Sequence, residues 1–279
     1  GYNPVTGLQT GTIDIMFKFI DGDECFPTDY VERLTPNDTF SFVPSEYNFG
    51  KEEVGFLYVY AVDTLAGNPV AFDYLIGTET IFDIDHLYSF TLKPLSVRAG
   101  TSGPDSDHKL RLDGIEYEQM ADEILIPRFF GQGPGSSFIS PFHSKMILIN
   151  LTGGAYFTAT AKMLIFNDNE QAFSDIVQFD CWEMKDLIDV SSATRLAFLE
   201  GTNHDPDEVY IDGVLQMETG WMKLNGDSAF SPVKDYNDPL IYAIQVEESL
   251  SYGYAAADLP FEKGVQNNGL LWSVSVSGE

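Results

Sequence analysis

The chain has 279 residues, of which 44% are hydrophobic and 14% are aromatic, so it is too apolar to remain disordered. Lys and Arg number 15 against 43 Asp and Glu, and the formal net charge of -28 would repel nucleic acids and anionic membrane surfaces. No apolar run reaches the roughly 18 residues that a membrane-spanning helix needs. We therefore expect a folded acidic protein with no nucleic-acid partner and no insertion into a membrane.

The chain opens at Gly1 without a basic, apolar leader, which is typical of a secreted protein whose signal peptide has been removed. We expect it outside the cell or at the cell surface, where salt and calcium ions would screen its charge.

Residues 12–20 begin a series of predicted β-strands. Ile13, Ile15, Phe17 and Phe19 alternate there with polar residues, which is the period of a strand with one buried face. Similar segments follow at residues 56–62, 70–76, 145–150, 157–166, 240–246 and 270–276. Turns rich in Gly, Asn and Asp separate them, and helical periodicity is confined to one or two turns at residues 117–126. The pattern predicts an all-β protein of two antiparallel β-sandwich domains, immunoglobulin-like or jelly-roll-like.

Two segments from different halves of the chain align without a gap, which suggests an internal duplication. Residues 20–24 and 28–31 match residues 166–170 and 174–177, and each pair reads as strand, acidic turn, strand. We expect a first domain over residues 1–104, a connecting segment rich in Gly, Pro and Ser over 105–137, and a second domain over 138–279. The second domain carries an insertion near residues 193–216.

Residues 55–79 read GFLYVYAVDTLAGNPVAFDYLIGTE, and LTPNDT precedes them at residues 34–39. This pattern resembles uncharacterised secreted bacterial surface proteins of the β-sandwich type, and the match is clear over about residues 17–79. The resemblance implies an extracellular β-rich protein without an assigned activity. It rests on strand and turn residues, so no functional residue follows from it.

The two cysteines, Cys25 and Cys181, lie in different halves of the chain and are too far apart in sequence for a zinc knuckle. In a secreted protein they could form a disulfide that joins the two domains, provided that their Cα atoms approach to about 6 Å. Two buried thiols are the alternative.

Acidic turns are the candidate metal sites, because calcium prefers closely spaced carboxylate and carbonyl oxygens. The candidate ligands are Asp21, Asp23 and Glu24 in the first turn, Asp168 and Glu170 in the matching turn of the second half, and Asp205 and Asp207. Asp105 and Asp107 form a further acidic loop. None has the spacing of an EF-hand, so the alternative is a set of ordinary solvated turns.

Signatures of catalysis are scarce in the sequence. The four histidines form no HExxH pair, and residues 133–137 do not match the Gly-x-Ser-x-Gly nucleophile turn. A glycoside hydrolase needs two carboxylates at a defined separation. The chain has 43 acidic residues, so the sequence alone does not show which two would lie at that separation. Aromatic side chains could instead form a platform for sugars, and the candidates are Trp182, Trp221, Trp272, Tyr252 and Tyr254, with Trp272 favoured as a core residue.

The sequence favours a non-enzymatic extracellular structural protein that associates with copies of itself as a subunit of a fibre, sheath or surface layer. The reasons are the sheet edges that antiparallel β-proteins expose and the extended segments at residues 1–10 and 270–279. The alternatives are a carbohydrate-binding or adhesion module with calcium-binding acidic loops and, third, a polysaccharide hydrolase.

Overall fold

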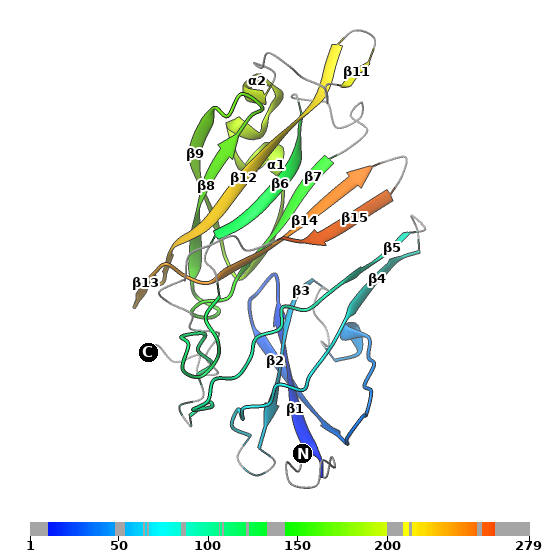
Figure 1. Cartoon of the computed structure of the whole chain (residues 1–279), viewed down its shortest axis with the longest axis vertical. Helices are drawn as coiled ribbons and strands as arrows, with labels where there is room; N and C mark the ends of the chain where they lie inside the picture. Colours follow the sequence, from blue (N-terminus) through cyan, green and yellow to red (C-terminus); the bar gives the residue numbers. More distant parts are fainter. Residues whose placement is uncertain are drawn as a thin grey trace.

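The computed structural model describes residues 11–47, 54–63, 65, 67–84, 88–105, 107, 109–120, 123–132, 143–199, 209–211, 214–249 and 253–259. Within these ranges the protein is built from β-strands, and every strand pair is antiparallel. Helical turns are short, at η1 (Pro44–Glu46), α1 (Leu187–Val190), η3 (Ser192–Thr194) and α2 (Leu196–Leu199). The predicted all-β fold class is confirmed (Figure 1).

The first half of the chain forms a three-stranded sheet in the order β2-β1-β3, from β1 (Ile13–Asp21), β2 (Pro27–Leu34) and β3 (Gly55–Val62). Ile15, Phe17 and Phe19 share one face of β1 and are buried, as the alternation predicts. Aromatic rings from the segment after β2 cover this face, with Phe17 and Phe42 in edge contact at 5.2 Å between ring centroids. These rings supply much of the first core.

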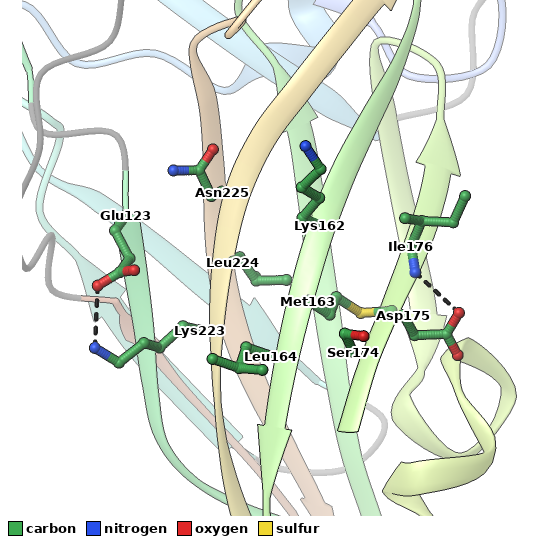
Figure 2. Close-up of a pocket in the computed structure, with 10 residues that line it drawn as sticks. All are labelled: Glu123, Lys162, Met163, Leu164, Ser174, Asp175, Ile176, Lys223, Leu224 and Asn225. Carbon is green, nitrogen blue, oxygen red and sulfur yellow. Dashed lines mark hydrogen bonds and ion pairs between the residues drawn. The ribbon is translucent and has the colours of Figure 1, made fainter. Parts of the chain in front are cut away.

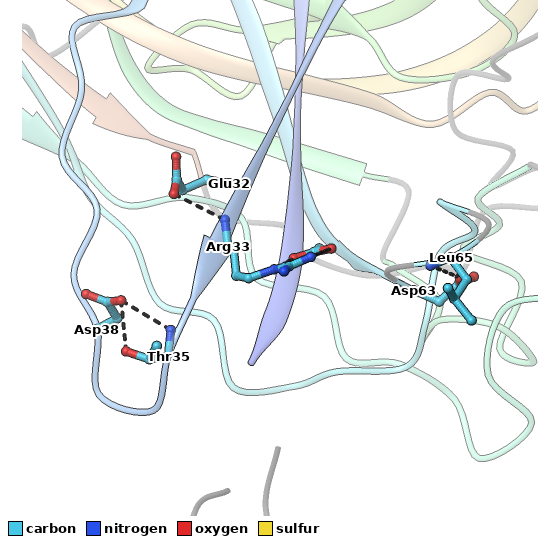
Figure 3. A network of polar contacts seen from close by, with 7 residues as sticks. Glu32, Arg33, Thr35, Asp38, Asp63 and Leu65 are labelled. Atoms are coloured by element: carbon cyan, nitrogen blue, oxygen red, sulfur yellow. Dashed lines mark hydrogen bonds and ion pairs between the residues drawn. The ribbon is translucent and has the colours of Figure 1, made fainter. Parts of the chain in front are cut away.

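The turn after β2 is closed by side-chain hydrogen bonds. Figure 3 shows Asp38 accepting from the backbone N–H and the hydroxyl of Thr35, at 3.2 and 3.0 Å. The backbone hydrogen bond from Thr35 holds the pKa of the Asp38 carboxyl below its usual value. On β2 itself, Arg33 forms a two-point ion pair with Asp14 of β1, at 2.7 and 3.0 Å.

A separate hairpin follows, made of β4 (Glu79–Asp83) and β5 (Tyr88–Leu92). Strand β5 lies beside β15 of the second half (Figure 1). Large apolar side chains in and before this hairpin face the solvent, and they are Tyr74, Ile76, Phe82 and Ile84.

The second half is a sandwich of two sheets. Sheet G has the order β10-β7-β14-β15, from β10 (Trp182–Asp186), β7 (His143–Asn150), β14 (Ile241–Ser249) and β15 (Gly253–Asp258). Sheet F has the order β11-β12-β8-β9, from β11 (Val209–Ile211), β12 (Val214–Phe230), β8 (Thr158–Phe166) and β9 (Ala172–Phe179). Strands β6 (Glu123–Gln132) and β13 (Asp235–Asn237) also pair with β12. The main core lies between the sheets, where Phe129, Met146 and Ile165 are fully buried.

The outer face of sheet G is covered by the first half of the chain. Phe56, Tyr58 and Tyr60 of β3 pack there against a second core cluster, to which the segment before β6 contributes Leu110 and Leu112. The part of sheet G around Ile147, Ile149 and Tyr242 is therefore covered on both faces, and the two halves share an apolar interface there.

Not every expectation holds. The strand expected at 70–76 does not form, since these residues have no regular secondary structure. Strand β6 lies within the expected connecting segment 105–137, and its Ile124 and Ile126 enter the second core, so this part of the segment belongs to sheet F. The turn of helix expected at 117–126 is absent from the described part of that range, because pairing with β12 makes it extended from Glu123 onward. Pro127 and the nearby glycines made this strand resemble a loop.

The matched segments of the suggested duplication are both hairpins, β1–β2 and β8–β9. The duplication itself stays a prediction. The expected strand at 270–276 and the terminal segment 1–10 lie outside the described residues.

Candidate functional site

The first acidic turn is closed by its own carboxylate. Asp21 is buried at 3% exposure, and its Oδ1 accepts the backbone N–H groups of Asp23 and Glu24, both at 2.9 Å. Asp168 and Glu170 lie exposed in the β8–β9 turn. Asp205 and Asp207 fall outside the described residues.

The structure brings together three other carboxylates. Among the described residues, Asp105, Asp107 and Glu116 form a group whose oxygens lie within 4.8 Å of one another. Glu116 is buried, which raises its pKa, and it accepts the backbone N–H groups of Asp105 and Arg111 at 3.2 and 2.9 Å. Arg111 also pairs with Asp107 at 3.2 Å, so a basic side chain already balances part of this charge. Glu116 was missed because nothing local in the sequence links it to Asp105.

Calcium binding at the acidic turns stays a prediction. Its check is a melting curve with and without EDTA, where calcium bound in the fold would make EDTA lower the melting temperature.

Cys25 and Cys181 form a disulfide with their Cα atoms 5.8 Å apart. Both are buried beside Ile20, with Phe56, Tyr58 and Trp182 packed around them. The bridge therefore links the β1–β2 turn of the first half to the start of β10 in the second.

The outer face of sheet F is more exposed than the outer face of sheet G. Among the described elements none packs across it, as the exposed fractions of Leu164 (39%) and Ile176 (55%) indicate. Strand register places its outward side chains in rows that cross four strands. One row is Ser174, Leu164, Lys223 and Leu125, and the next is Ile176, Lys162, Asn225 and Glu123.

A depression of about 370 Å³ lies on this face, and Figure 2 shows the side chains around it. Lys223 of β12 pairs with Glu123 of β6 at 3.0 Å, with the two side chains only 19% and 18% exposed. Lys162 of β8 pairs with Asp227 and is more exposed. Leu164 and Ile176 supply apolar surface beside these ion pairs.

An aromatic row continues the same face. Trp221 of β12 lies opposite Phe166 of β8, and their rings stack at 4.0 Å between centroids and 6° between planes. The ammonium of Lys223 lies 6.0 Å from the Trp221 ring. Of the other aromatic candidates, Trp182 packs at the interface between the halves and Tyr254 lies on β15, while Tyr252 and Trp272 are outside the described residues.

Strand β9 forms one edge of sheet F, at the outer side of the molecule (Figure 1). Two hydrogen bonds show which of its backbone groups point away from β8. The N–H of Asn167 donates to the carbonyl of Gln171 at 3.3 Å, so residues 167 and 171 form a hydrogen-bonded pair at the end of the ladder. The N–H of Ile176 donates instead to the side chain of Asp175 at 2.9 Å, so it is not bonded to β8. Because bonded and non-bonded pairs alternate in an antiparallel ladder, the even-numbered residues of β9 direct their backbone groups outward.

The eight residues of β9 include one charged side chain, Asp175, and no proline. Four other sheet edges carry features that oppose pairing with another chain. Strand β2 begins with Pro27 and contains Asp29, Glu32 and Arg33, β10 is only five residues long, and β15 lies beside β5. Strand β3 is uncharged, but its end is covered at the bridge between Val62 and Pro69.

A polar group also lies inside the second sandwich. Ser144 of β7 donates to the carboxylate of Glu247 on β14 at 2.8 Å, and the backbone N–H of Phe130 donates to Ser144 at 2.7 Å. Burial raises the pKa of Glu247 to about 7.

No family model matches the chain, and no curated protein matches it. Among solved structures, the crystal structure of Thermotoga maritima 1070 is similar at 13% sequence identity, over 52% of this chain and 97% of that chain, with a TM-score of 0.30. A TM-score this low supports no inference about function. None of the helices in the described ranges has both the length and the apolar character needed to cross a membrane.

Proposed function

We propose that this protein is a non-enzymatic extracellular structural subunit whose copies associate through the edge strand β9, building a fibre, sheath or surface layer. The observation that carries the proposal is the composition and direction of β9. It is eight residues long, it contains a single charge, and its even-numbered residues direct backbone donors and acceptors away from the sheet. Such an edge can add a strand from another chain.

The exposed apolar residues of the β4–β5 region support the same function. Ile76 and Phe82 are 100% and 72% exposed, and exposed apolar surface is typical of contact sites between proteins. A contact between β9 and a different surface of the next copy generates a filament when the rotation between copies does not close a ring.

The high negative charge of the chain should make assembly depend on the salt concentration. Copies that each carry a formal charge of -28 repel one another, and salt shortens the range of that repulsion to about 8 Å at physiological ionic strength. We expect association to strengthen as salt increases.

The test is Ser174→Pro. The N–H of Ser174 points outward, so proline removes a donor from the edge while leaving the pairing with β8 in place. Ser174→Ala is the matched control, since it keeps the N–H. Light scattering after size-exclusion chromatography and electron microscopy should show assemblies for the wild type and for Ser174→Ala, and monomers for Ser174→Pro. A wild type that stays monomeric at every salt and calcium concentration would reject self-assembly, and equal assembly of both variants would reject β9 as its site.

A further inference from the structure

We propose that the outer face of sheet F binds a neutral oligosaccharide, seated in the depression between β6, β12, β8 and β9. This inference is independent of self-association, because it concerns the face of the sheet and not the edge of β9.

The shape and the apolar surface of the depression suit a sugar ring. Its volume of about 370 Å³ is at the lower end of the roughly 300–1,000 Å³ typical of small-molecule sites. A pyranose ring has an apolar C–H face and a rim of hydroxyl groups. Leu164 and Ile176 offer exposed apolar surface to the C–H face.

Polar groups stand where the hydroxyl rim would lie. Lys223 and Glu123 hold each other at 3.0 Å, so an ammonium donor and a carboxylate acceptor are presented side by side with little freedom to move. Asn225 is the neighbour of Glu123 in the same row and adds an amide. A sugar hydroxyl both donates and accepts, so it can bond to such a pair without separating it.

The balance of charges on this face favours a neutral ligand over an anionic one. The two lysines of the depression are each balanced by a carboxylate, Glu123 or Asp227, so this face is close to neutral on a molecule with a net charge of -28. An anionic ligand would be repelled by the surrounding charge. A neutral polar chain meets no such barrier.

Trp221 extends the platform along β12. It lies two residues from Lys223 on the same side of the strand, about 7 Å away along the sheet. Its stacking on Phe166 fixes the ring in place, which reduces the conformational entropy that binding would cost. A chain of two or more sugar rings could therefore span Trp221 and the depression.

The experiment measures binding of cellohexaose, maltohexaose, xylohexaose and mannohexaose, with sialyllactose as an anionic probe, by titration calorimetry. It uses the wild-type protein at a concentration and salt at which size-exclusion chromatography shows a monomer, so that self-assembly does not affect the result. The variants are Lys223→Met and Asn225→Ala. The matched control is Lys145→Met on sheet G, because Lys145 also pairs with a glutamate and lies near an aromatic ring, Tyr254, but does not line the depression on sheet F.

We expect at least one neutral hexasaccharide to bind and sialyllactose not to bind. Lys223→Met should weaken the affinity by about tenfold or more, as expected for loss of a charged hydrogen bond. Asn225→Ala should weaken it less, and Lys145→Met should leave it unchanged. The proposal is overturned if no neutral hexasaccharide binds at millimolar concentration, or if Lys145→Met weakens binding as much as Lys223→Met. Circular dichroism of each variant identifies a loss of binding that comes from misfolding, and in that case Asn225→Ala decides the outcome.

Discussion

Glu247 is a partly buried carboxyl group whose protonation should affect the stability of the fold. It faces the interior of the second sandwich, where Ser144 and Gln245 contact its carboxylate. Burial raises its pKa from 4.5 to about 7. The folded state therefore binds this proton more tightly than the unfolded state does, and the stability that the protonated group contributes is lost as pH rises from about 4.5 to about 7.

Glu247→Gln should remove this dependence. At pH 8 the variant should be more stable than the wild type by about 1–3 kcal/mol, because a neutral amide replaces a buried charge, and at pH 4 it should show no gain. Glu248→Gln is the control, since Glu248 pairs with Lys145 and its loss should not stabilise the fold at pH 8. Urea unfolding at the two pH values gives the comparison. An equal change at both pH values for Glu247→Gln would mean that the carboxyl does not titrate as described.

At the scale of elements, the long strand β12 organises the second half. It pairs with β6, β8, β11 and β13, and its register shifts between Gly226 and Ser228. At this bulge the backbone of Pro239 passes so close that a Cβ on Gly226 would lie 2.2 Å from its carbonyl oxygen. The bulge thus needs glycine for close approach and not for an unusual φ angle.

Gly226→Ala should lower the free energy of unfolding by about 2 kcal/mol or more, because the backbone of Pro239 must shift. Gly77→Ala is a suitable comparison, since the nearest atom to its Cβ would be 3.7 Å away on the Pro94 side chain. Thermal unfolding of the two variants measures the difference. Similar melting temperatures would show that the contact at Pro239 relaxes easily.

At the scale of the whole molecule, the two halves are held by one covalent bond and one apolar interface. The disulfide between Cys25 and Cys181 closes a loop with a sequence separation of 156 residues. Next to it, the rings of β3 pack on the outer face of sheet G. These contacts join the two halves directly.

Replacing both cysteines by alanine should destabilise the protein by roughly 2–5 kcal/mol, because a long loop is no longer closed in the unfolded state. The apolar interface remains, so we expect the double variant to fold. Calorimetry of the wild type under reducing and oxidising conditions, compared with the double variant, tests this effect. A melting temperature of the wild type that does not respond to reduction, with loss of the bridge verified by mass spectrometry, would contradict it.

Local sequence indicated several of the strands and, in β1, which side of the strand is buried. The alternation around Phe17 correctly assigned the buried face of β1, and the acidic turns at residues 21–24 and 167–171 mark two real hairpins. These features depend on neighbours a few residues apart, because a strand has a period of two and a hairpin turn is local.

Only the tertiary structure decided what covers each face and which distant groups meet. The sequence predicts a connecting segment at β6 because the partner strand β12 lies about ninety residues later, and no local pattern shows this pairing. Glu116 meets Asp105 for a similar reason. Tyr242 and Trp221 lie on strands with the same alternation, yet Tyr242 is packed under the first half and Trp221 lies on the outer face of sheet F. Periodicity states which side chains share a face, but the packing of other segments determines whether that face becomes core or remains available for binding.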